Sequence, residues 1–141
     1  MKPKAIILDG VDGVGKSSVR ILISNYNGNH FIVERFTPSI YSYGKFYNRK
    51  LDIDYIFSLE ESLQKSFDVC AIFFKCSLDV LFERFKLGKH VITLTEADLQ
   101  YLQNEMEKYI DTMSKIKWIK IDNTHLSPQE IFEFLKKECE L

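Results

Sequence analysis

The sequence predicts an α/β fold of three layers, α/β/α, built on a short parallel sheet of about four strands. Four short apolar runs, rich in Ile, Val and Phe, alternate with segments whose apolar residues recur at helical spacing. Strands that alternate with helices form parallel sheets covered on both faces. No repeat, low-complexity tract or Pro/Gly/Ser-rich linker interrupts the 141 residues, so one domain over residues 1–141 is expected.

The expected strands are short apolar runs bounded by turn-forming residues. They cover residues 5–9, 30–36, 69–75 and 118–122. The first strand is expected to lie between the second and the third. Ligands of such sheets bind beyond the carboxyl ends of the strands, where the strand order reverses.

Each expected helix has one apolar face and a recognisable start. The helices cover residues 16–25, 54–66, 77–87 and 95–113, and a last one opens at Ser127-Pro128. Ser77, Thr95 and the pair Ser127 and Glu130 are the expected N-terminal caps. In the second helix the residues at helical spacing are Tyr55, Leu59, Ser62 and Leu63. The aromatic segment 39–47 is expected to be irregular.

Composition excludes several function classes. The formal net charge is −1 with Lys and Arg spread along the chain, which argues against a nucleic-acid partner. No apolar run approaches the roughly 20 residues of a membrane span, and no signal peptide is recognised, so a cytoplasmic protein is expected. Cys70 and Cys76 flank an apolar run and are interpreted as buried thiols.

A glycine-rich segment follows the first expected strand. Gly10, Gly15, Lys16 and Ser17 fit the phosphate-loop pattern G-x-x-x-x-G-K-[ST], between a strand and a helix as that motif requires. Bare backbone lets the loop N–H groups point at phosphate, and the following helix N-terminus favours an anion. The residues expected to bind the phosphates of ATP are Gly10, Gly13, Val14, Gly15, Lys16, Ser17 and Ser18. Ser17 is the expected Mg²⁺ ligand.

Two carboxylates accompany this loop. Asp9 ends the first strand, either as a second Mg²⁺ ligand or as a carboxylate bonded to loop N–H groups. Asp12 lies inside the loop, where negative charge beside an anion is unfavourable. It is tolerable if Asp12 faces a second substrate that carries a hydroxyl group.

The stretch "LDGVDGVGKSS" resembles the glycine loop of the thymidylate kinases and related nucleoside monophosphate kinases, which typically read [FIV]-E-G-x-D-G-x-G-K-[ST]. Asp12 and Gly13 match the "DG" that separates this family from most other phosphate-loop proteins. The resemblance implies the phosphate-loop NTPase fold and a position for Asp12 near the sugar 3′-hydroxyl of the acceptor. Asp9 stands where the family usually has Glu.

The stretch "FIVERFTPSIYSYGKFY" resembles the family's D-R-[YF] segment. Arg35 would bind the acceptor's phosphate with its forked guanidinium; the alternative is an ion pair with Glu34 or Asp12. Glu34 would act as a base or as an Mg²⁺ partner. Ser39 and Tyr43 would contact the acceptor. Four aromatic residues would either stack on a base or fill the core: Tyr41, Tyr43, Phe46 and Tyr47.

Two weaker resemblances lie further along the chain. Arg84 matches the family's lid-entry arginine, which clamps the transferred phosphate; the alternative is a surface ion pair. A second lid arginine is missing, and only Lys86, Lys89 and His90 are available. The last strand and helix resemble the family's, and the loop between them, with Asn123 and Thr124, would border the adenine of ATP.

The resemblance implies Mg-assisted phosphoryl transfer from ATP to a (deoxy)nucleoside monophosphate such as dTMP, with Lys16, Glu34, Arg35 and Arg84 in the catalytic machinery. Relatives are longer by about one strand and two helices, chiefly between the glycine helix and the D-R strand, so two alternatives stay open. One is a deoxynucleoside kinase that uses Glu34 as base, because a Glu-Arg pair is similar to that family. The other is a degenerate nucleotide-binding module. A homodimer is compatible with all three.

Overall fold

The computed structural model describes residues 2–88, 90 and 93–141. Within these residues four strands and six helices follow one another in chain order: β1 (Lys4–Asp9), α1 (Lys16–Tyr26), β2 (Phe31–Glu34), α2 (Thr37–Phe46), α3 (Ile53–Ser66), β3 (Asp68–Lys75), α4 (Leu78–Leu87), α5 (Glu96–Thr112), β4 (Trp118–Asp122) and α6 (Pro128–Glu138). None of the helices in the described part of the chain is long and apolar enough to cross a membrane.

The four strands form one parallel sheet in the order β2-β1-β3-β4, with β1 between β2 and β3 as predicted. Leu8 lies opposite Glu34, and Asp9 lies opposite Phe73. The glycine loop therefore leaves β1 at the carboxyl edge, between the ends of β2 and β3. This is the switch point at which such sheets bind ligands.

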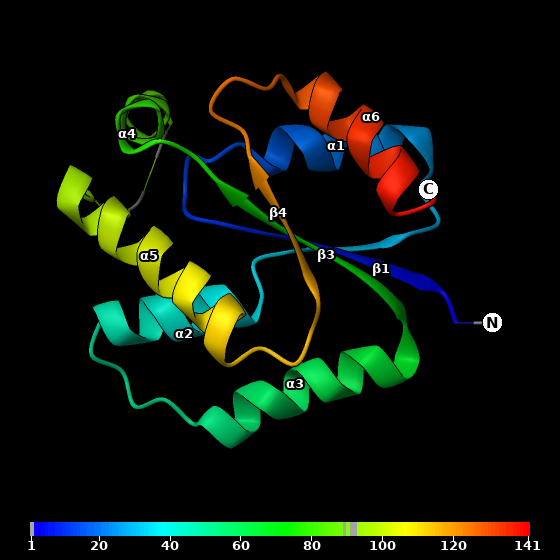
Figure 1. Cartoon of the computed structure of the whole chain (residues 1–141), viewed down its shortest axis with the longest axis horizontal. Helices are drawn as coiled ribbons and strands as arrows, with labels where there is room; N and C mark the ends of the chain where they lie inside the picture. The colour runs from blue at the N-terminus through cyan, green and yellow to red at the C-terminus, as the bar shows by residue number, and fades with distance from the viewer. Residues whose placement is uncertain (1, 89, 91–92) are drawn as a thin grey trace.

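Helices cover both faces of the sheet, which confirms the predicted three-layer fold. α1 and α6 lie on one face, and α2, α3 and α5 lie on the other (Figure 1). β1 is buried from Ala5 to Asp9, so it contributes side chains to both layers. Ile6 and Leu8 belong to the larger core cluster and Ile7 to the smaller one.

The predicted caps of the last two helices are confirmed. Thr95 with Asp98, and Ser127 with Glu130, each form a reciprocal capping box. Ser77 takes the N-cap position of α4, although no side-chain hydrogen bond caps that helix. The N-termini of these two helices could be predicted from the sequence because the capping groups lie within four residues of one another.

The segment expected to be irregular is instead the helix α2, and that expectation was wrong. Most of its residues have weak helix propensity: five are aromatic or β-branched, and Pro38, Gly44 and two serines are also present. Pro38 at the second helical position favours a helix start, and burial of Ser42 and Tyr43 adds packing energy. The N–H of Ser39, in the first turn, donates to the Asp9 carboxylate at 3.0 Å. The cap of α2 thus comes from a residue 30 positions away, which local sequence does not reveal.

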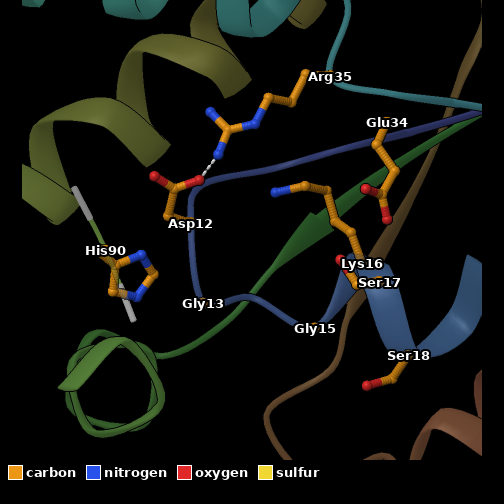
Figure 2. A pocket seen from close by; sticks show the side chains of 9 residues that line it. All are labelled: Asp12, Gly13, Gly15, Lys16, Ser17, Ser18, Glu34, Arg35 and His90. Carbon is orange, nitrogen blue, oxygen red and sulfur yellow. Dashed lines mark ion pairs between the residues drawn. The ribbon is translucent and has the colours of Figure 1, made fainter. Parts of the chain in front are cut away.

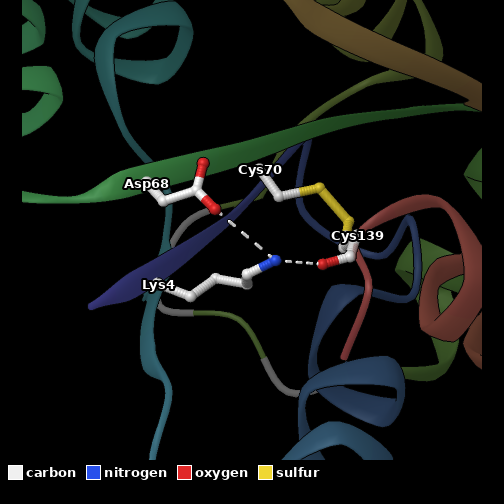
Figure 3. Close-up of a disulfide and its surroundings, with 4 residues drawn as sticks. All are labelled: Lys4, Asp68, Cys70 and Cys139. Atoms are coloured by element: carbon white, nitrogen blue, oxygen red, sulfur yellow. Dashed lines mark hydrogen bonds and ion pairs between the residues drawn. A yellow bond between two sulfur atoms is a disulfide. The ribbon is translucent and has the colours of Figure 1, made fainter. Parts of the chain in front are cut away.

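The prediction of free thiols was half right. Cys76 is a buried free thiol, and burial raises the pKa of its side chain. Cys70 on β3 instead forms a disulfide with Cys139 at the end of α6, with Cα atoms 5.9 Å apart (Figure 3). Lys4 lies beside this bond and contacts Asp68 and the Cys139 carbonyl oxygen (Figure 3). The disulfide fastens the last helix to the sheet.

Reducing this disulfide is expected to lower the free energy of unfolding by about 2–4 kcal/mol, because the bond restricts the unfolded chain over a long loop. The two cysteines are 69 residues apart. Urea unfolding with and without dithiothreitol measures the effect, and Cys139→Ser serves as a control that does not respond to reductant. Three titratable thiols in the denatured, unreduced protein would contradict the bond.

Candidate nucleotide site

The glycine loop takes backbone conformations that residues with side chains disfavour. Gly10 has φ 148° and Gly13 has φ 86°. A Cβ on Gly10 would lie 2.7 Å from the Phe74 carbonyl oxygen, and one on Gly13 would lie 2.9 Å from the Phe85 Cα. The loop thus packs against the ends of β3 and α4 with no room for a side chain at either position.

Lys16 folds back over this loop from the first turn of α1. Its ammonium donates hydrogen bonds to the carbonyl oxygens of Gly10 at 2.6 Å and Val11 at 3.0 Å. The residue is 7% exposed, and this burial lowers the pKa of Lys16, while the charges of Asp9 and Glu34 oppose the shift. A phosphate group offers this ammonium stronger acceptors than two carbonyl groups.

A cavity of about 360 Å³ opens in front of Lys16, and we call it the loop cavity (Figure 2). Its lining is Asp12, Gly13, Gly15, Lys16, Ser17, Ser18, Glu34, Arg35 and His90. The structure therefore brings five of the seven predicted phosphate-binding residues together with Glu34 and Arg35. Gly10 and Val14 support the loop from behind: the Gly10 carbonyl accepts from Lys16, and the Val14 carbonyl accepts from Asn123.

Asp9 lies beneath the loop and is fully buried. One oxygen accepts from the Gly10 N–H at 2.8 Å and the Ser39 hydroxyl at 2.5 Å. The other accepts from the N–H groups of Phe36 and Ser39, each at 3.0 Å. Burial raises the pKa of Asp9, and the Lys16 charge and these hydrogen bonds act against that shift. Of the two roles expected for Asp9, this geometry is that of the carboxylate bonded to N–H groups.

Arg35 follows β2 with a left-handed backbone, φ 70°, which is uncommon for a residue with a side chain. Its N–H continues the sheet by donating to the Leu8 carbonyl at 3.0 Å, and the next residue is held by Asp9. The sharp turn directs the guanidinium at the glycine loop, where it pairs with Asp12 (Figure 2). Arg35 and the loop thus converge at one sheet edge, as predicted, and the predicted alternative pairing with Asp12 is present.

Glu34 points into the loop cavity from the end of β2 (Figure 2). One of its oxygens accepts from the Arg20 Nε at 3.2 Å. Arg20 was not predicted as a site residue because the contact joins α1 to β2 across 14 residues. Arg20 therefore holds one oxygen of Glu34, and Glu34 also lines the loop cavity.

A second cavity, of about 320 Å³, lies on the far side of Arg35, and we call it the tyrosine cavity. Its lining is Asp12, Arg35, Phe36, Ser39, Ile40, Tyr43, Tyr47 and Arg49. All four residues predicted to contact the acceptor are therefore present, but the Ser39 hydroxyl is already bonded to Asp9. The Tyr43 hydroxyl is buried and has no hydrogen-bond partner within the described residues.

The four aromatic residues of α2 and its end divide into two pairs. Tyr43 and Tyr47 line the tyrosine cavity. Tyr41 packs on Tyr109 with ring centroids 5.2 Å apart, and Phe46 lies 6.2 Å from the ring of Tyr101. The first pair is thus placed to contact a base, and the second pair packs against α5.

A third cavity, of about 280 Å³, lies on the other side of the glycine loop and is called the Asn123 cavity. Its lining is Gly13, Val14, Gly15, Ser18, Arg84, Asn123, Leu126, Pro128 and Ile131. Asn123 is in the position expected to border adenine. Thr124 does not line this cavity: its hydroxyl accepts from the Ser77 N–H and donates to Asp122, so Thr124 ties β4 to α4.

Arg84 is held by Asn123, and its expected contact with a transferred phosphate stays a prediction. Its guanidinium donates to the side-chain and main-chain oxygens of Asn123, each at 3.1 Å. It therefore lines the Asn123 cavity instead of the loop cavity, and no surface carboxylate pairs with it within the described residues. Of the lid residues, Lys86 pairs with Glu83, His90 stacks on Phe85, and Lys89 lies outside the described residues.

No group of three or more His, Cys, Asp or Glu side chains is placed to hold a metal ion in residues 2–88, 90 and 93–141. Mg²⁺ bound with nucleotide needs only one or two protein oxygens, because phosphate and water complete its shell. Ser17 lines the loop cavity and can supply one such oxygen. Asp9, with four hydrogen bonds and no exposed surface, is not placed to supply another.

Comparison with known proteins places this fold. No known family profile matches the sequence, and no curated protein matches it. Solved structures do match over nearly the whole chain. The YorR protein of Bacillus subtilis, in complex with phosphorylated GDP, aligns with a TM-score of 0.75 and 17% identity over 98% of this chain and 96% of that one.

Two further structures are similar. Thymidylate kinase from Candida albicans gives a TM-score of 0.73 and 14% identity over 99% of this chain and 92% of its own. Deoxyadenosine kinase from M. mycoides, with products dCMP and dCDP bound, gives 0.66 and 14% over 96% and 98%. The fold is therefore that of the phosphate-loop nucleotide kinases, in a form with a four-stranded sheet.

Proposed function

We propose that this protein transfers the γ-phosphoryl group of ATP to a (deoxy)nucleoside monophosphate, in the manner of the thymidylate kinases. The observation that carries the proposal is the Asp12–Arg35 pair, which lines both the loop cavity and the tyrosine cavity. The two cavities are thus joined by a guanidinium suited to phosphate. ATP would occupy the loop cavity with its adenosine toward the Asn123 cavity, and the acceptor would occupy the tyrosine cavity.

The transfer needs positioning and charge stabilisation more than proton chemistry. An oxygen of the acceptor phosphate attacks the γ-phosphorus, the bond to the β–γ bridging oxygen breaks, and ADP leaves with that electron pair. A monophosphate is largely deprotonated at neutral pH, so no general base is required. Lys16 and the loop N–H groups would neutralise the phosphates of ATP, and Arg35 would hold the acceptor.

Ser17 is the residue that fits Mg²⁺, together with phosphate oxygens and water. When bound, the ion would supply positive charge that offsets the negative charge of the phosphates. Arg84 would act on the ATP side through Asn123 rather than on the transferred group. The roles of Asp12, Ser39 and Tyr43 would be to shape the acceptor end, with Asp12 near a sugar hydroxyl.

The ligands named for the similar solved structures are nucleotides, which supports a site that binds nucleoside phosphates. YorR was solved with phosphorylated GDP, and the deoxyadenosine kinase with dCMP and dCDP. Because ATP and nucleoside monophosphates are cytoplasmic metabolites, we place the protein in the cytoplasm, in nucleotide biosynthesis, without a nucleic-acid partner. A homodimer is part of the proposal and is tested by gel filtration with light scattering.

A deoxynucleoside kinase is the second candidate, and one contact favours it. Arg20 holds one oxygen of Glu34, which lines the loop cavity. That arrangement suits a carboxylate that removes the proton of a sugar 5′-hydroxyl. A nucleotide-binding module without turnover is the third candidate, and its signature would be ATP binding with no transfer.

A transfer assay separates these candidates. The protein is incubated with radiolabelled MgATP and, one at a time, the common nucleosides and their monophosphates. We expect labelled diphosphate from at least one monophosphate and little product from nucleosides. Labelled monophosphate from a nucleoside would favour the deoxynucleoside kinase, and no product despite ATP binding would favour the module.

MgATP is expected to raise the thermal stability of the wild type, and Lys16→Ala is expected to remove most of that shift. A ligand at about 100 times its Kd stabilises the folded state by about 2.7 kcal/mol. Melting temperatures with and without millimolar MgATP measure the effect, each variant being compared with its own ligand-free form. Lys50→Ala, an exposed lysine that lines none of the three cavities, is the matched control. An unchanged wild-type melting temperature would overturn ATP binding.

A further inference from the structure

Arg49 lies three residues after the end of α2, and the proposed transfer reaction gives it no role. The helix ends in a paired-turn cap: the Asn48 N–H donates to the Lys45 carbonyl at 3.1 Å, and the Arg49 N–H donates to the Gly44 carbonyl at 2.8 Å. Asn48 takes the left-handed conformation, φ 53°, that this cap requires. The chain therefore reverses at Asn48, and the backbone of Arg49 is fixed.

This reversal places Arg49 beside the tyrosine cavity. Its guanidinium carbon lies 4.9 Å from the ring centroid of Tyr47. Tyr43 lies one helical turn before Tyr47, and the guanidinium carbon of Arg35 lies 5.5 Å from the ring centroid of Tyr43. The two tyrosine rings are nearly parallel, with an interplanar angle of 19° and centroids 6.3 Å apart. Two guanidinium groups on two stacked tyrosines thus line one cavity.

The two arginines differ in what already binds them. Arg35 forms an ion pair with Asp12, the one carboxylate in the lining of the tyrosine cavity. Arg49 has no carboxylate within 4.0 Å among the described side chains and is exposed. Stacking on Tyr47 restricts its guanidinium plane but leaves its N–H donors in the plane available. These donors face solvent and are therefore available to a bound ligand.

The order of groups along the acceptor follows from the two cavities. Its phosphate must meet the γ-phosphate near Lys16, and the loop cavity and the tyrosine cavity meet at Asp12 and Arg35. The nucleoside must then extend away from the loop, past Tyr43 toward Tyr47 and Arg49. At that end the Arg49 guanidinium would meet the edge of the base, beside the Tyr47 ring.

We propose that Arg49 determines base specificity and selects acceptors whose base carries an exocyclic oxygen at this edge, a 6-oxopurine or a 4-oxopyrimidine, over the corresponding amino bases. The inference rests on the proposed function. Guanidinium donates five hydrogen bonds and accepts none, so it matches the O6 and N7 acceptors of guanine or O4 of thymine. The amino groups of adenine and cytosine would set donor against donor.

Direct binding tests this inference without turnover. Calorimetric titrations with dGMP, dAMP, dTMP and dCMP are made in saturating MgADP, which fills the loop cavity and has no γ-phosphoryl group to transfer. We expect wild type to bind dGMP over dAMP, and dTMP over dCMP, by about 5- to 150-fold, the range for one good arginine contact to a base edge. Arg49→Ala is expected to bring both ratios close to one, mainly by weakening dGMP and dTMP.

Lys50→Ala is the matched control, because it removes the neighbouring exposed cation outside the cavity and should leave both ratios unchanged. Equal binding of oxo and amino nucleotides by wild type would overturn the inference, as would unchanged ratios in Arg49→Ala or no binding at all. The proposed function is tested separately by the transfer assay. Selective binding without transfer would sink the kinase proposal and leave the base selection by Arg49 supported.

Discussion

Glu60→Ala is expected to lower the free energy of unfolding by about 3–5 kcal/mol, because each buried hydrogen-bond donor that loses its acceptor costs about 1–3 kcal/mol and several donors do so here. Glu60 is fully buried in α3. Its carboxylate accepts from the hydroxyls of Thr37 at 2.7 Å, Tyr109 at 2.8 Å and Ser114 at 2.8 Å, and from the Lys115 N–H at 2.7 Å. Alanine would leave four buried or partly buried donors without this acceptor.

The loss of stability should affect the whole fold, because the hydrogen bonds of Glu60 join several helices and the segment before β4. Thr37 begins α2, Tyr109 lies in α5, and Ser114 and Lys115 precede β4. Urea denaturation followed by circular dichroism measures the change in midpoint. Glu61→Ala is the matched control: Glu61 is exposed on the same helix and pairs only with Lys65 in the i,i+4 relation, worth about 0.3–0.5 kcal/mol. Equal midpoints for the two variants would show that Glu60 does not join these elements.

Glu60 also shows where helical periodicity misleads. Tyr55, Leu59, Ser62 and Leu63 were the residues expected at helical spacing in α3, but the buried residues are Ile56 and Glu60. Tyr55 is 58% exposed. A periodicity analysis treats a glutamate as a surface residue, because a buried carboxylate depends on donors from other elements. Those donors lie 23 to 55 positions away in the sequence, so they cannot be predicted from the residues near Glu60.

The parts of the site that could be predicted are those with local causes. The glycine loop needs a strand before it, a helix after it and glycine at fixed places, and all of these lie within residues 4–26. The convergence of Arg35 with this loop was also predictable. Parallel strands end at one sheet edge, and β2 neighbours β1.

The parts that could not be predicted depend on contacts between distant segments. The cap of α2 is the Asp9 carboxylate, and the partner of Glu34 is Arg20 on α1. The contact of Arg84 with Asn123 joins residues 39 positions apart. Arg49 follows no motif, and only the reversal after α2 places it at the tyrosine cavity. Each of these contacts joins segments that are distant in the sequence, so it can be known only after the fold has brought those segments together.

Arg35→Ala is expected to lower kcat/KM for the preferred nucleoside monophosphate by about 30- to 5,000-fold, which corresponds to 2–5 kcal/mol for a charge pair that the bound acceptor would bury. The reason is that Arg35 lines both cavities and is the cation at their junction. The thermal shift caused by MgATP should survive, because Lys16 and the loop glycines are unchanged. Arg35→Lys should recover little, since a point charge does not reproduce the forked contact.

The ion pair with Asp12 requires its own control, because Arg35→Ala also leaves that carboxylate without its partner. The double variant Arg35→Ala, Asp12→Asn removes the negative charge of Asp12 as well. If activity returns, the loss came from Asp12 repelling phosphate; if it does not, the guanidinium itself binds the acceptor. A wild type that uses nucleosides better than monophosphates would contradict the phosphate role altogether. In that case Glu34→Gln, which removes the carboxylate that Arg20 orients, should cause the larger loss, and the deoxynucleoside kinase would be the function that the site performs.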